Sequence, residues 1–313
     1  MGQGKGYGKT ILFGEHFVVY GLPAIASAFS DATIAKVERL EGQTGWKLDD
    51  SRPEVPGYKA KKIDQQRQSI ENVLKYCGVD TSQTGIKITY EGDLTCASGF
   101  GASAASCTSL ARALNEEFTL GLNDEQINEA AYEGEKAYHG SPSGIDNTCS
   151  TYGGLVWYQR NLEGGKNIVE TMRLNKPVEL VLAATGISAD TAEVVGDVRA
   201  KKEADPAWFD GIVSQYSELV QKARDALLGL RFDEVGQLMN ENHRLLQEIT
   251  VSCPELDDLV ETARTNGAAG AKLTGTGRGG IQISLTPGED LQSEVAAALE
   301  AKGVSVWKVK IGI

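Results

Sequence analysis

The chain has 313 residues, 41% of them hydrophobic, so it is long enough for two domains with buried cores. Asp and Glu outnumber Lys and Arg by 43 to 31, and the net charge of -12 argues against non-specific binding to nucleic acid or to anionic lipid. A polyphosphate ligand would have to be held locally, by backbone N–H groups, a helix N-terminus and a cation.

Cysteine usage and hydropathy indicate a cytoplasmic protein. The five cysteines are scattered, and no CxxC pair or histidine spacing suggests a zinc site, so we expect reduced thiols. No apolar run approaches the ~20 residues that span a bilayer, and the N-terminus lacks the apolar core of a signal peptide. We therefore expect no membrane association.

The first half of the chain is expected to mix strands and helices. Apolar β-branched stretches predict two strands joined by turns within Thr10–Ala28. Asn123 is the expected N-cap of one of two helices. The other predicted strands are Ala32–Leu40, Ile86–Tyr90, Gly154–Gln159 and Glu179–Thr185, and the predicted helices are Ser103–Phe118 and Asp124–Tyr138.

The second half is dominated by helices and adds antiparallel strands, which makes the fold class α+β. Apolar periodicity lapses in Arg160–Lys176, so we place the domain boundary there and predict domains 1–170 and 171–313. The predicted helices are Phe209–Leu228, Phe232–Ile249, Glu255–Asn266 and Leu291–Lys302, and strands are expected within Lys272–Leu285 and at Val304–Ile311.

A glycine-rich segment runs directly into a predicted helix and is suited to binding phosphate. It comprises Ser98, Gly99, Phe100, Gly101, Ala102, Ser103 and Ala104. Glycines let the backbone curl around an anion, and the first turn of a helix offers free N–H groups and a positive dipole end. The segment does not match the Walker pattern. A tight turn with Ser103 as an ordinary N-cap is an equally good interpretation of this motif alone.

Two further motifs contain residues suited to phosphoryl chemistry. The segment His139–Asn147 follows a helix that ends with Glu135, a position where a carboxylate opposes the helix dipole unless a cation compensates it. In the same segment, Asp146 taken alone is better explained as an Asx-turn. The segment Lys272–Gly280 holds four glycines within its last six residues, more than a hairpin requires, which suggests close approach of a ligand or of another backbone.

Taken together, three segments resemble the signature motifs of the galactokinase, homoserine kinase, mevalonate kinase and phosphomevalonate kinase (GHMP) superfamily. They are Lys9–His16, Gly99–Ala105 and Lys272–Gly280, and they lie far apart along the chain. The resemblance implies an N-terminal domain similar to ribosomal protein S5 domain 2, a ferredoxin-like C-terminal domain, and an active site between them.

Within the superfamily, Gly14–Ala26 and His139–Asn147 resemble segments of the mevalonate kinase family. The resemblance implies that the substrate is mevalonate and that the reaction serves isoprenoid and sterol biosynthesis. Val18 stands where galactokinases carry an acidic residue. The GYGK start, the GFGAS loop and the TGTGRGG motif are most similar to the trypanosomatid forms of this family. The resemblance leaves a homodimer open. A kinase for phosphomevalonate or a related hydroxy acid, or a sensor that lost catalysis, remains an alternative.

The resemblance also implies roles for individual residues. Asp146 would accept or orient the proton of the primary hydroxyl, and Lys9 would favour alkoxide character on that oxygen. Mg²⁺ would be held by Ser103 and Glu135, both oxygen ligands, and the phosphates of ATP would lie on the N–H groups of the 98–104 segment. The residues expected to contact mevalonate are Glu15, His16, Ser143, Tyr152 and Thr191.

Three positions depart from the family pattern. Gly8 replaces a proline, Ala102 replaces the first of two serines, and Arg278 replaces a glycine. An arginine in a glycine-rich loop should either adopt an ordinary backbone conformation or be retained for a purpose. Arg278 is expected either to contact the ATP phosphates or the substrate carboxylate, or to point to solvent.

Overall fold

The computed structural model describes residues 1–96, 99–140, 142–187 and 189–312, and it divides the chain into two compact units. Unit 1 contains residues 1–9 and 28–153, and unit 2 contains residues 10–27 and 154–313. Both units contain helices and antiparallel strands, which confirms the α+β prediction. The prediction of domains 1–170 and 171–313 stays a prediction. Among the described residues, no helix is both long enough and apolar enough to cross a membrane.

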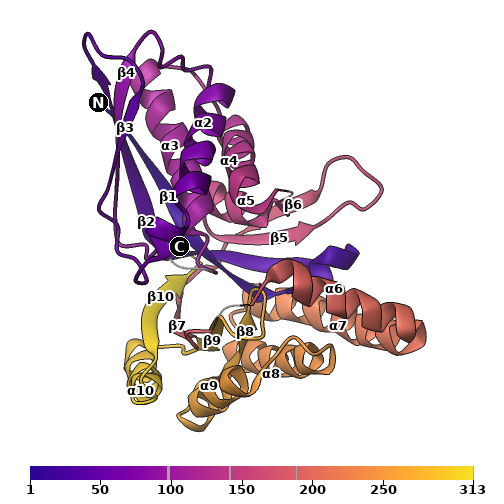
Figure 1. Ribbon diagram of the computed structural model, residues 1–313. Helices are drawn as coiled ribbons and strands as arrows, with labels where there is room; N and C mark the ends of the chain where they lie inside the picture. The colour runs from indigo at the N-terminus through magenta and orange to yellow at the C-terminus, as the bar shows by residue number, and fades with distance from the viewer. Residues whose placement is uncertain (97–98, 141, 188, 313) are drawn as a thin grey trace. The chain divides into compact units, whose positions relative to one another are not determined.

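In unit 1, helices cover one face of a sheet. Strand β2 pairs antiparallel with β4, with Ile34 opposite Glu91 and Leu40 opposite Gly85, and β3 pairs parallel with β4. Strand β1 pairs with β2, and both strands continue into unit 2. The elements are β1 (Gly2–Phe13), β2 (Ala24–Leu40), β3 (Trp46–Asp50), β4 (Gly85–Glu91), α1 (Tyr58–Lys61), α2 (Ile63–Tyr76), α3 (Ala102–Phe118), α4 (Asp124–His139) and α5 (Ile145–Tyr152) (Figure 1).

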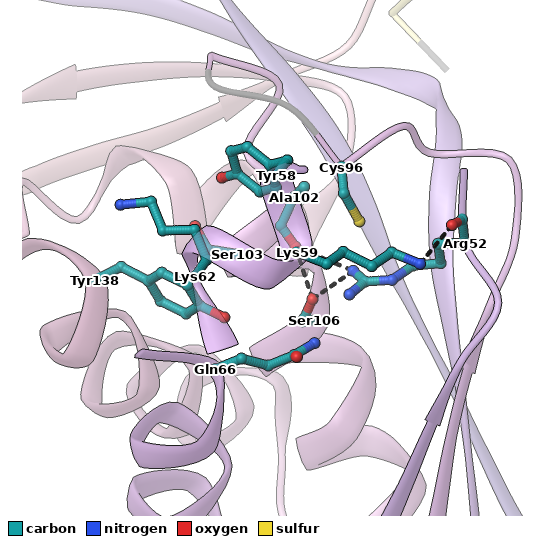
Figure 2. A pocket seen from close by; sticks show the side chains of 10 residues that line it. All are labelled: Arg52, Tyr58, Lys59, Lys62, Gln66, Cys96, Ala102, Ser103, Ser106 and Tyr138. Carbon is teal, nitrogen blue, oxygen red and sulfur yellow. Dashed lines mark hydrogen bonds between the residues drawn. The ribbon is translucent and has the colours of Figure 1, made fainter. Parts of the chain in front are cut away.

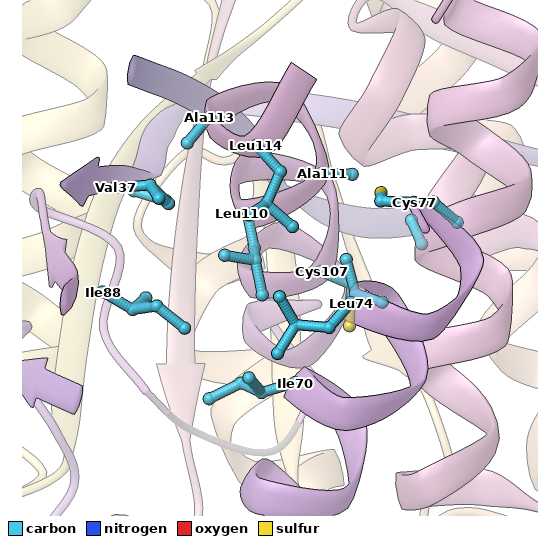
Figure 3. Close-up of a cluster of buried hydrophobic side chains, with 14 of the residues drawn as sticks. Val37, Ile70, Leu74, Cys77, Ile88, Cys107, Leu110, Ala111, Ala113 and Leu114 are labelled. Carbon is cyan, nitrogen blue, oxygen red and sulfur yellow. The ribbon is translucent and has the colours of Figure 1, made fainter. Parts of the chain in front are cut away.

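The core of unit 1 lies between this sheet and helices α2, α3 and α4. Figure 3 shows side chains of α2 and α3, including Leu74 and Leu110, pointing toward Val37 of β2 and Ile88 of β4. All four are at most 3% exposed. Burial of such side chains stabilises the fold by about 1.5–3 kcal/mol each, so this contact holds α3 in place on the sheet.

Strand β1 lies against the backbone of α3 because its glycines leave room. A Cβ atom added at Gly2, Gly4 or Gly6 would come within 2.1–2.3 Å of a carbonyl oxygen of α3. The three glycines are spaced two residues apart, so they lie on one face of the strand. The helix carbonyls that they meet, at residues 113, 109 and 105, are spaced four residues apart and lie on one face of the helix. The strand that contains Lys9 is therefore packed directly on the helix that follows the glycine-rich segment.

Unit 2 is built on the antiparallel sheet β10-β7-β9-β8. Leu182 of β7 lies opposite Ile283 of β9 on one side and Trp307 of β10 on the other. A core of apolar residues joins β7 and β8 to α9 and α10. The elements are the 3₁₀ helix η1 (Phe17–Tyr20), β5 (Leu155–Gln159), β6 (Ile168–Met172), β7 (Val178–Ala184), α6 (Thr191–Ala204), α7 (Pro206–Leu228), α8 (Phe232–Glu248), α9 (Pro254–Thr265), β8 (Gly270–Thr274), β9 (Ile281–Leu285), α10 (Glu289–Glu300) and β10 (Ser305–Ile311).

Most predicted elements are present within a few residues of their predicted bounds, but several elements were not predicted. Helix α4 begins as expected: the Asn123 side chain accepts from the Gln126 N–H, and the Gln126 side chain accepts in return. Within Thr10–Ala28, η1 lies between the two predicted strands. The first of them, β1, already begins at Gly2, and the second is continuous with the predicted strand Ala32–Leu40 and forms the single strand β2 with it. The unpredicted elements are η1, β3, α1, α2, α5, α6 and β6, the last of which lies inside the predicted boundary segment.

Candidate active site

The glycine-rich segment of unit 1 forms the head of α3. Gly99 and Gly101 adopt φ angles of 95° and 70°, which favour glycine, and Gly101 is the N-cap. Ser103 therefore lies in the first turn and is not the N-cap, so the alternative of an ordinary serine cap is wrong. The backbone N–H of Lys9 donates to the Phe100 carbonyl at 2.9 Å, which ties β1 to the loop. The first-turn N–H groups of α3 have no intrahelical acceptors and suit an anion.

Lys9 and Asp146 form an ion pair beside this loop. The Lys9 Nζ lies 3.1 Å from the Asp146 Oδ1, and Lys9 is 5% exposed. A Cβ at Gly101 would lie 2.8 Å from the Lys9 Cγ, so the aliphatic part of the Lys9 side chain packs directly against the loop. Asp146 lies in the first turn of α5, where the helix dipole favours a carboxylate. The Asx-turn interpretation is therefore wrong.

Glu135, in the last turn of α4, is almost completely buried. Its burial, together with the charge of Asp146, raises its pKa to about 8, although a hydrogen bond with Ser103 and the charge of Lys9 oppose this rise. Among the described residues, nothing donates a hydrogen bond to the Glu135 Oε1. A buried carboxylate oxygen without a partner is costly, so this site is suited to a cation that would satisfy it.

A cavity with an empty volume of about 300 Å³ opens beside the first turn of α3 (Figure 2). Arg52 anchors its wall, since its Nη1 donates to the Ser106 Oγ at 2.6 Å while its Nη2 pairs with Asp50 at 2.6 Å. The remaining wall supplies two aromatic rings, two ammonium groups and an amide. The lining residues are Arg52, Tyr58, Lys59, Lys62, Gln66, Cys96, Ala102, Ser103, Ser106 and Tyr138.

In unit 2, Glu15 is held by a lysine that sequence reasoning did not assign. The Lys272 Nζ donates to the Glu15 Oε1, and both side chains are fully buried. Burial raises the pKa of Glu15 and lowers the pKa of Lys272, and the mutual attraction of the two charges opposes both shifts. A signal was present in the sequence: Lys272 is the one charged residue of the β8 segment GAKLT, whose five residues are all buried.

His16 and Thr191 are joined through one residue of the third motif. The His16 Nε2 lies 2.7 Å from the Thr276 carbonyl oxygen, and the Thr276 and Thr191 hydroxyls are 2.7 Å apart. Burial lowers the pKa of His16, so its neutral form is favoured. Its ring then donates to the carbonyl through Nε2 and presents Nδ1, which has no partner among the described residues, as an acceptor.

The predicted site residues therefore form one cluster in each unit. Unit 1 brings together Lys9, Ser103, Glu135 and Asp146, and unit 2 contains Glu15, His16 and Thr191. Ser98 lies outside the described residues. The other predicted substrate contacts belong to unit 1: the Ser143 Oγ accepts from the Ile145 N–H at 3.3 Å, and Tyr152 is 39% exposed at the opposite end of α5 from Asp146.

Two family descriptions and many known proteins match this chain. Residues 66–154 match "GHMP kinases N terminal domain", and residues 223–305 match "GHMP kinases C terminal". The mevalonate kinase of Thermococcus sibiricus is 34% identical, with 94% of this chain and 91% of that protein covered. The mevalonate kinase of Candida albicans is 26% identical, with 97% and 86% covered.

Solved structures match over nearly the whole chain. The crystal structure of Leishmania major mevalonate kinase in complex with R-mevalonate superposes with a TM-score of 0.96 at 43% identity, covering 99% of this chain and 96% of that one. The Methanococcus jannaschii mevalonate kinase superposes with a TM-score of 0.80 at 25% identity, covering 99% and 98%.

Proposed function

The chain belongs to the mevalonate kinase family of the GHMP kinases, which are ATP-dependent phosphotransferases with an alcohol acceptor, and we propose that it transfers the γ-phosphoryl group of ATP to the primary hydroxyl of mevalonate. The observation that carries this proposal is the ion pair between Lys9 and Asp146 beside the glycine-rich loop. The choice of mevalonate as the acceptor is supported by the similarity of this chain, at 43% identity, to a kinase crystallised with R-mevalonate.

Asp146 and Lys9 would act on the acceptor hydroxyl. Phosphoryl transfer asks a protein mainly to align the two reactants and to neutralise charge. The Asp146 carboxylate is 26% exposed, so it can accept a proton from a bound hydroxyl, while the buried Lys9 ammonium stabilises negative charge on the oxygen that attacks. The hydrogen bond from Lys9 to Phe100 and the packing of β1 on α3 would keep this pair aligned with the phosphate-binding loop.

ATP would be held by the residues around the head of α3. The backbone from Gly99 to Ala104, with Ser98 before it, would place N–H groups against the β- and γ-phosphates. The adjoining cavity is lined in part by tyrosine rings and ammonium groups, so we assign it to the remainder of the nucleotide. This local arrangement provides positive potential within a chain whose net charge is -12.

The residues beside Asp146 fit a magnesium ion. Glu135 offers a buried oxygen without a partner, and Ser103 offers a hydroxyl that already contacts this carboxylate. The described residues contain no group of three or more His, Cys, Asp and Glu able to hold a metal. Two protein oxygens suit Mg²⁺, because this ion is usually bound by one or two carboxylates, substrate phosphates and water. When bound, Mg²⁺ would neutralise charge on the phosphates.

Mevalonate would be recognised by the cluster of unit 2, and Ser143 and Tyr152 of unit 1 are proposed separately as substrate contacts. The Thr276 and Thr191 hydroxyls and the His16 ring place several hydrogen-bonding groups together. The Glu15 Oε2 has no partner among the described residues and could accept from a substrate hydroxyl, while Lys272 holds the other oxygen. These groups match a small hydroxy acid, which carries both hydroxyls and a carboxylate.

Purified protein with Mg-ATP should release ADP with mevalonate as the acceptor. The coupled assay is run in parallel with phosphomevalonate, galactose and homoserine, and the mevalonate product is checked for a phosphate on the primary hydroxyl. Turnover of another acceptor without turnover of mevalonate would replace the assignment with a different GHMP kinase. Binding of ATP without turnover of any acceptor would identify a sensor.

A further inference from the structure

Arg278 lies in the glycine-rich loop of unit 2 with a backbone conformation that arginine rarely adopts. Its φ angle is 50°, and the flanking Gly277 and Gly279 have φ angles of 80° and 122°. A non-glycine residue in the left-handed region costs free energy and persists where surrounding contacts compensate for it. Of the two alternatives predicted for Arg278, the ordinary backbone conformation is therefore absent, which favours retention of the residue for its contacts.

Three contacts hold Arg278, and its side chain is engaged within unit 2 instead of pointing to open solvent. Its backbone N–H donates to the Val251 carbonyl at 2.8 Å, and its Nε donates to the Thr250 carbonyl at 3.1 Å. Its Nη1 lies 2.5 Å from the Asp197 Oδ2 of α6. Thr250 is also left-handed, with a φ angle of 65°, so two strained residues support each other at this point.

Among the described residues, helix α6 buries little apolar surface. Of its 14 residues, the buried ones are Val194 and Val198. Lys202, near its C-terminal end, lies over the Tyr20 and Phe209 rings, 4.7 Å and 5.5 Å from their centroids. Its N-terminal end meets the glycine-rich loop through the Thr191 hydroxyl, 2.7 Å from that of Thr276. A helix with so little apolar burial depends on polar contacts for its position.

The same loop carries the contact to His16. Thr276, two residues before Arg278, accepts from or donates to Thr191 through its hydroxyl and contacts His16 through its carbonyl. The charge of Arg278 contributes, after burial, to lowering the pKa of His16, which reflects their closeness. A shift of α6 relative to the loop would therefore displace the hydrogen-bonding groups that we assign to mevalonate.

We propose that Arg278 is a positioning residue for the acceptor, resting on the proposed function: it clamps α6 to the 275–280 loop through Asp197 and thereby holds Thr191, Thr276 and His16 in their binding arrangement. Arg278 lowers the KM for mevalonate and does not affect the binding of the nucleotide, which we assign to unit 1. The arginine is required for its shape, since its Nε and Nη1 atoms bind two different acceptors at once, which a lysine cannot reproduce.

The test compares Arg278→Gly, Arg278→Lys, Asp197→Asn and the Arg278→Gly/Asp197→Asn double variant with the wild type. Lys201→Ala is the matched control, because it removes an exposed charge from the same helix. The Arg278–Asp197 pair is partly exposed, with Asp197 51% exposed, and such pairs contribute up to about 1 kcal/mol, so the KM for mevalonate should rise by roughly two- to fivefold in Arg278→Gly and Asp197→Asn. The KM of the double variant for mevalonate should equal that of the more affected single variant, since each substitution removes the same ion pair.

Two further readouts separate positioning from general structural support. In Arg278→Gly and Asp197→Asn, kcat and the KM for ATP should stay within about twofold of wild type, and amide hydrogen exchange in 191–197 should accelerate. Lys201→Ala should change none of these. An unchanged mevalonate KM, with or without faster exchange, overturns the proposal. If the wild type instead phosphorylates a different alcohol, the proposed function fails, and the same KM comparison is made with that alcohol.

Discussion

Replacing Lys272 with methionine should strongly destabilise unit 2, because it leaves a buried carboxylate without its counter-charge. The side chains of Lys272 and Glu15 are both 0% exposed, and the Glu15 Oε2 already lacks a partner among the described residues. Breaking a buried ion pair by removing one member typically costs about 3–5 kcal/mol. For a unit of this size, each kcal/mol lowers the melting temperature by roughly 2–4 °C, so the expected fall is about 6–20 °C.

The destabilisation should depend on pH in a defined direction. Burial already raises the pKa of Glu15, and removal of Lys272 takes away the attraction that opposes this rise. A carboxyl whose pKa is higher in the folded state than in the unfolded state binds its proton more readily when folded, so stability falls as pH rises from the unfolded pKa, 4.5, to the folded pKa. The deficit of Lys272→Met relative to wild type should therefore be largest near pH 8 and shrink toward pH 5.

A double variant supplies the control. In Glu15→Leu/Lys272→Met both charges are absent, and apolar replacement of a buried pair is often neutral, so most of the lost melting temperature should return. Melting is followed by circular dichroism or calorimetry at pH 5, 6, 7 and 8. A Lys272→Met melting temperature within about 3 °C of wild type at pH 8, or a deficit that does not change with pH, would refute the reasoning that this pair is a compensated buried charge.

Three other outcomes follow from the structure of unit 1. Asp146→Asn should lower kcat by ~10²–10⁴-fold with ATP binding retained, and a near-normal kcat in steady-state assays would leave Asp146 as a helix N-terminal residue alone. Ser103→Ala and Glu135→Gln should each raise the Mg²⁺ concentration for half-maximal activity by ~10-fold or more, and unchanged metal titrations would remove both from the metal site. Burial and the charge of Asp93 raise the pKa of Asp31 from 3.8 to about 6, so Asp31→Asn should increase stability at pH 8 by up to about 1 kcal/mol after solvent screening, with the gain lost as pH falls through 6 toward 3.8. Equal gains in melting temperature at pH 8 and pH 4 would contradict that explanation.

Helices with a clear apolar period could be predicted from the sequence, and those without one could not. Helix α8 has Val235, Met239 and Leu246 buried at helical spacing, and its predicted bounds differ from the observed ones by one residue. Helix α2 buries Gln66 and Ser69 along with its apolar residues, so its stripe is masked by polar side chains. Helix α6 buries two valines, and the contacts that we assign to its positioning are an ion pair and a hydroxyl contact with the 275–280 loop, which leave no periodic pattern.

The glycine-rich turn at the start of α3 could be predicted from local sequence, and its proposed binding of phosphate depends on the backbone itself. Gly99 and Gly101 before a helix indicate a phosphate-binding turn, because glycine conformations and free N–H groups depend on neighbours in the chain. The three motifs together indicated the kinase family, and the matches over nearly the whole chain bear that out. The assignment of single residues to substrate or metal remains a proposal.

The tertiary structure decided the partners of the charged residues. Lys9 and Lys272 each begin a segment that resembles a superfamily motif, yet Lys9 pairs with the partly exposed Asp146 while Lys272 pairs with Glu15 in a fully buried position, 257 residues away in the sequence. The glycines at 2, 4 and 6 likewise had no local explanation, because their purpose is contact with the backbone of α3. The sequence by itself determined which conformations and charges were available, whereas burial and distant neighbours decided what each charge does, since desolvation and pairing depend on the folded surroundings.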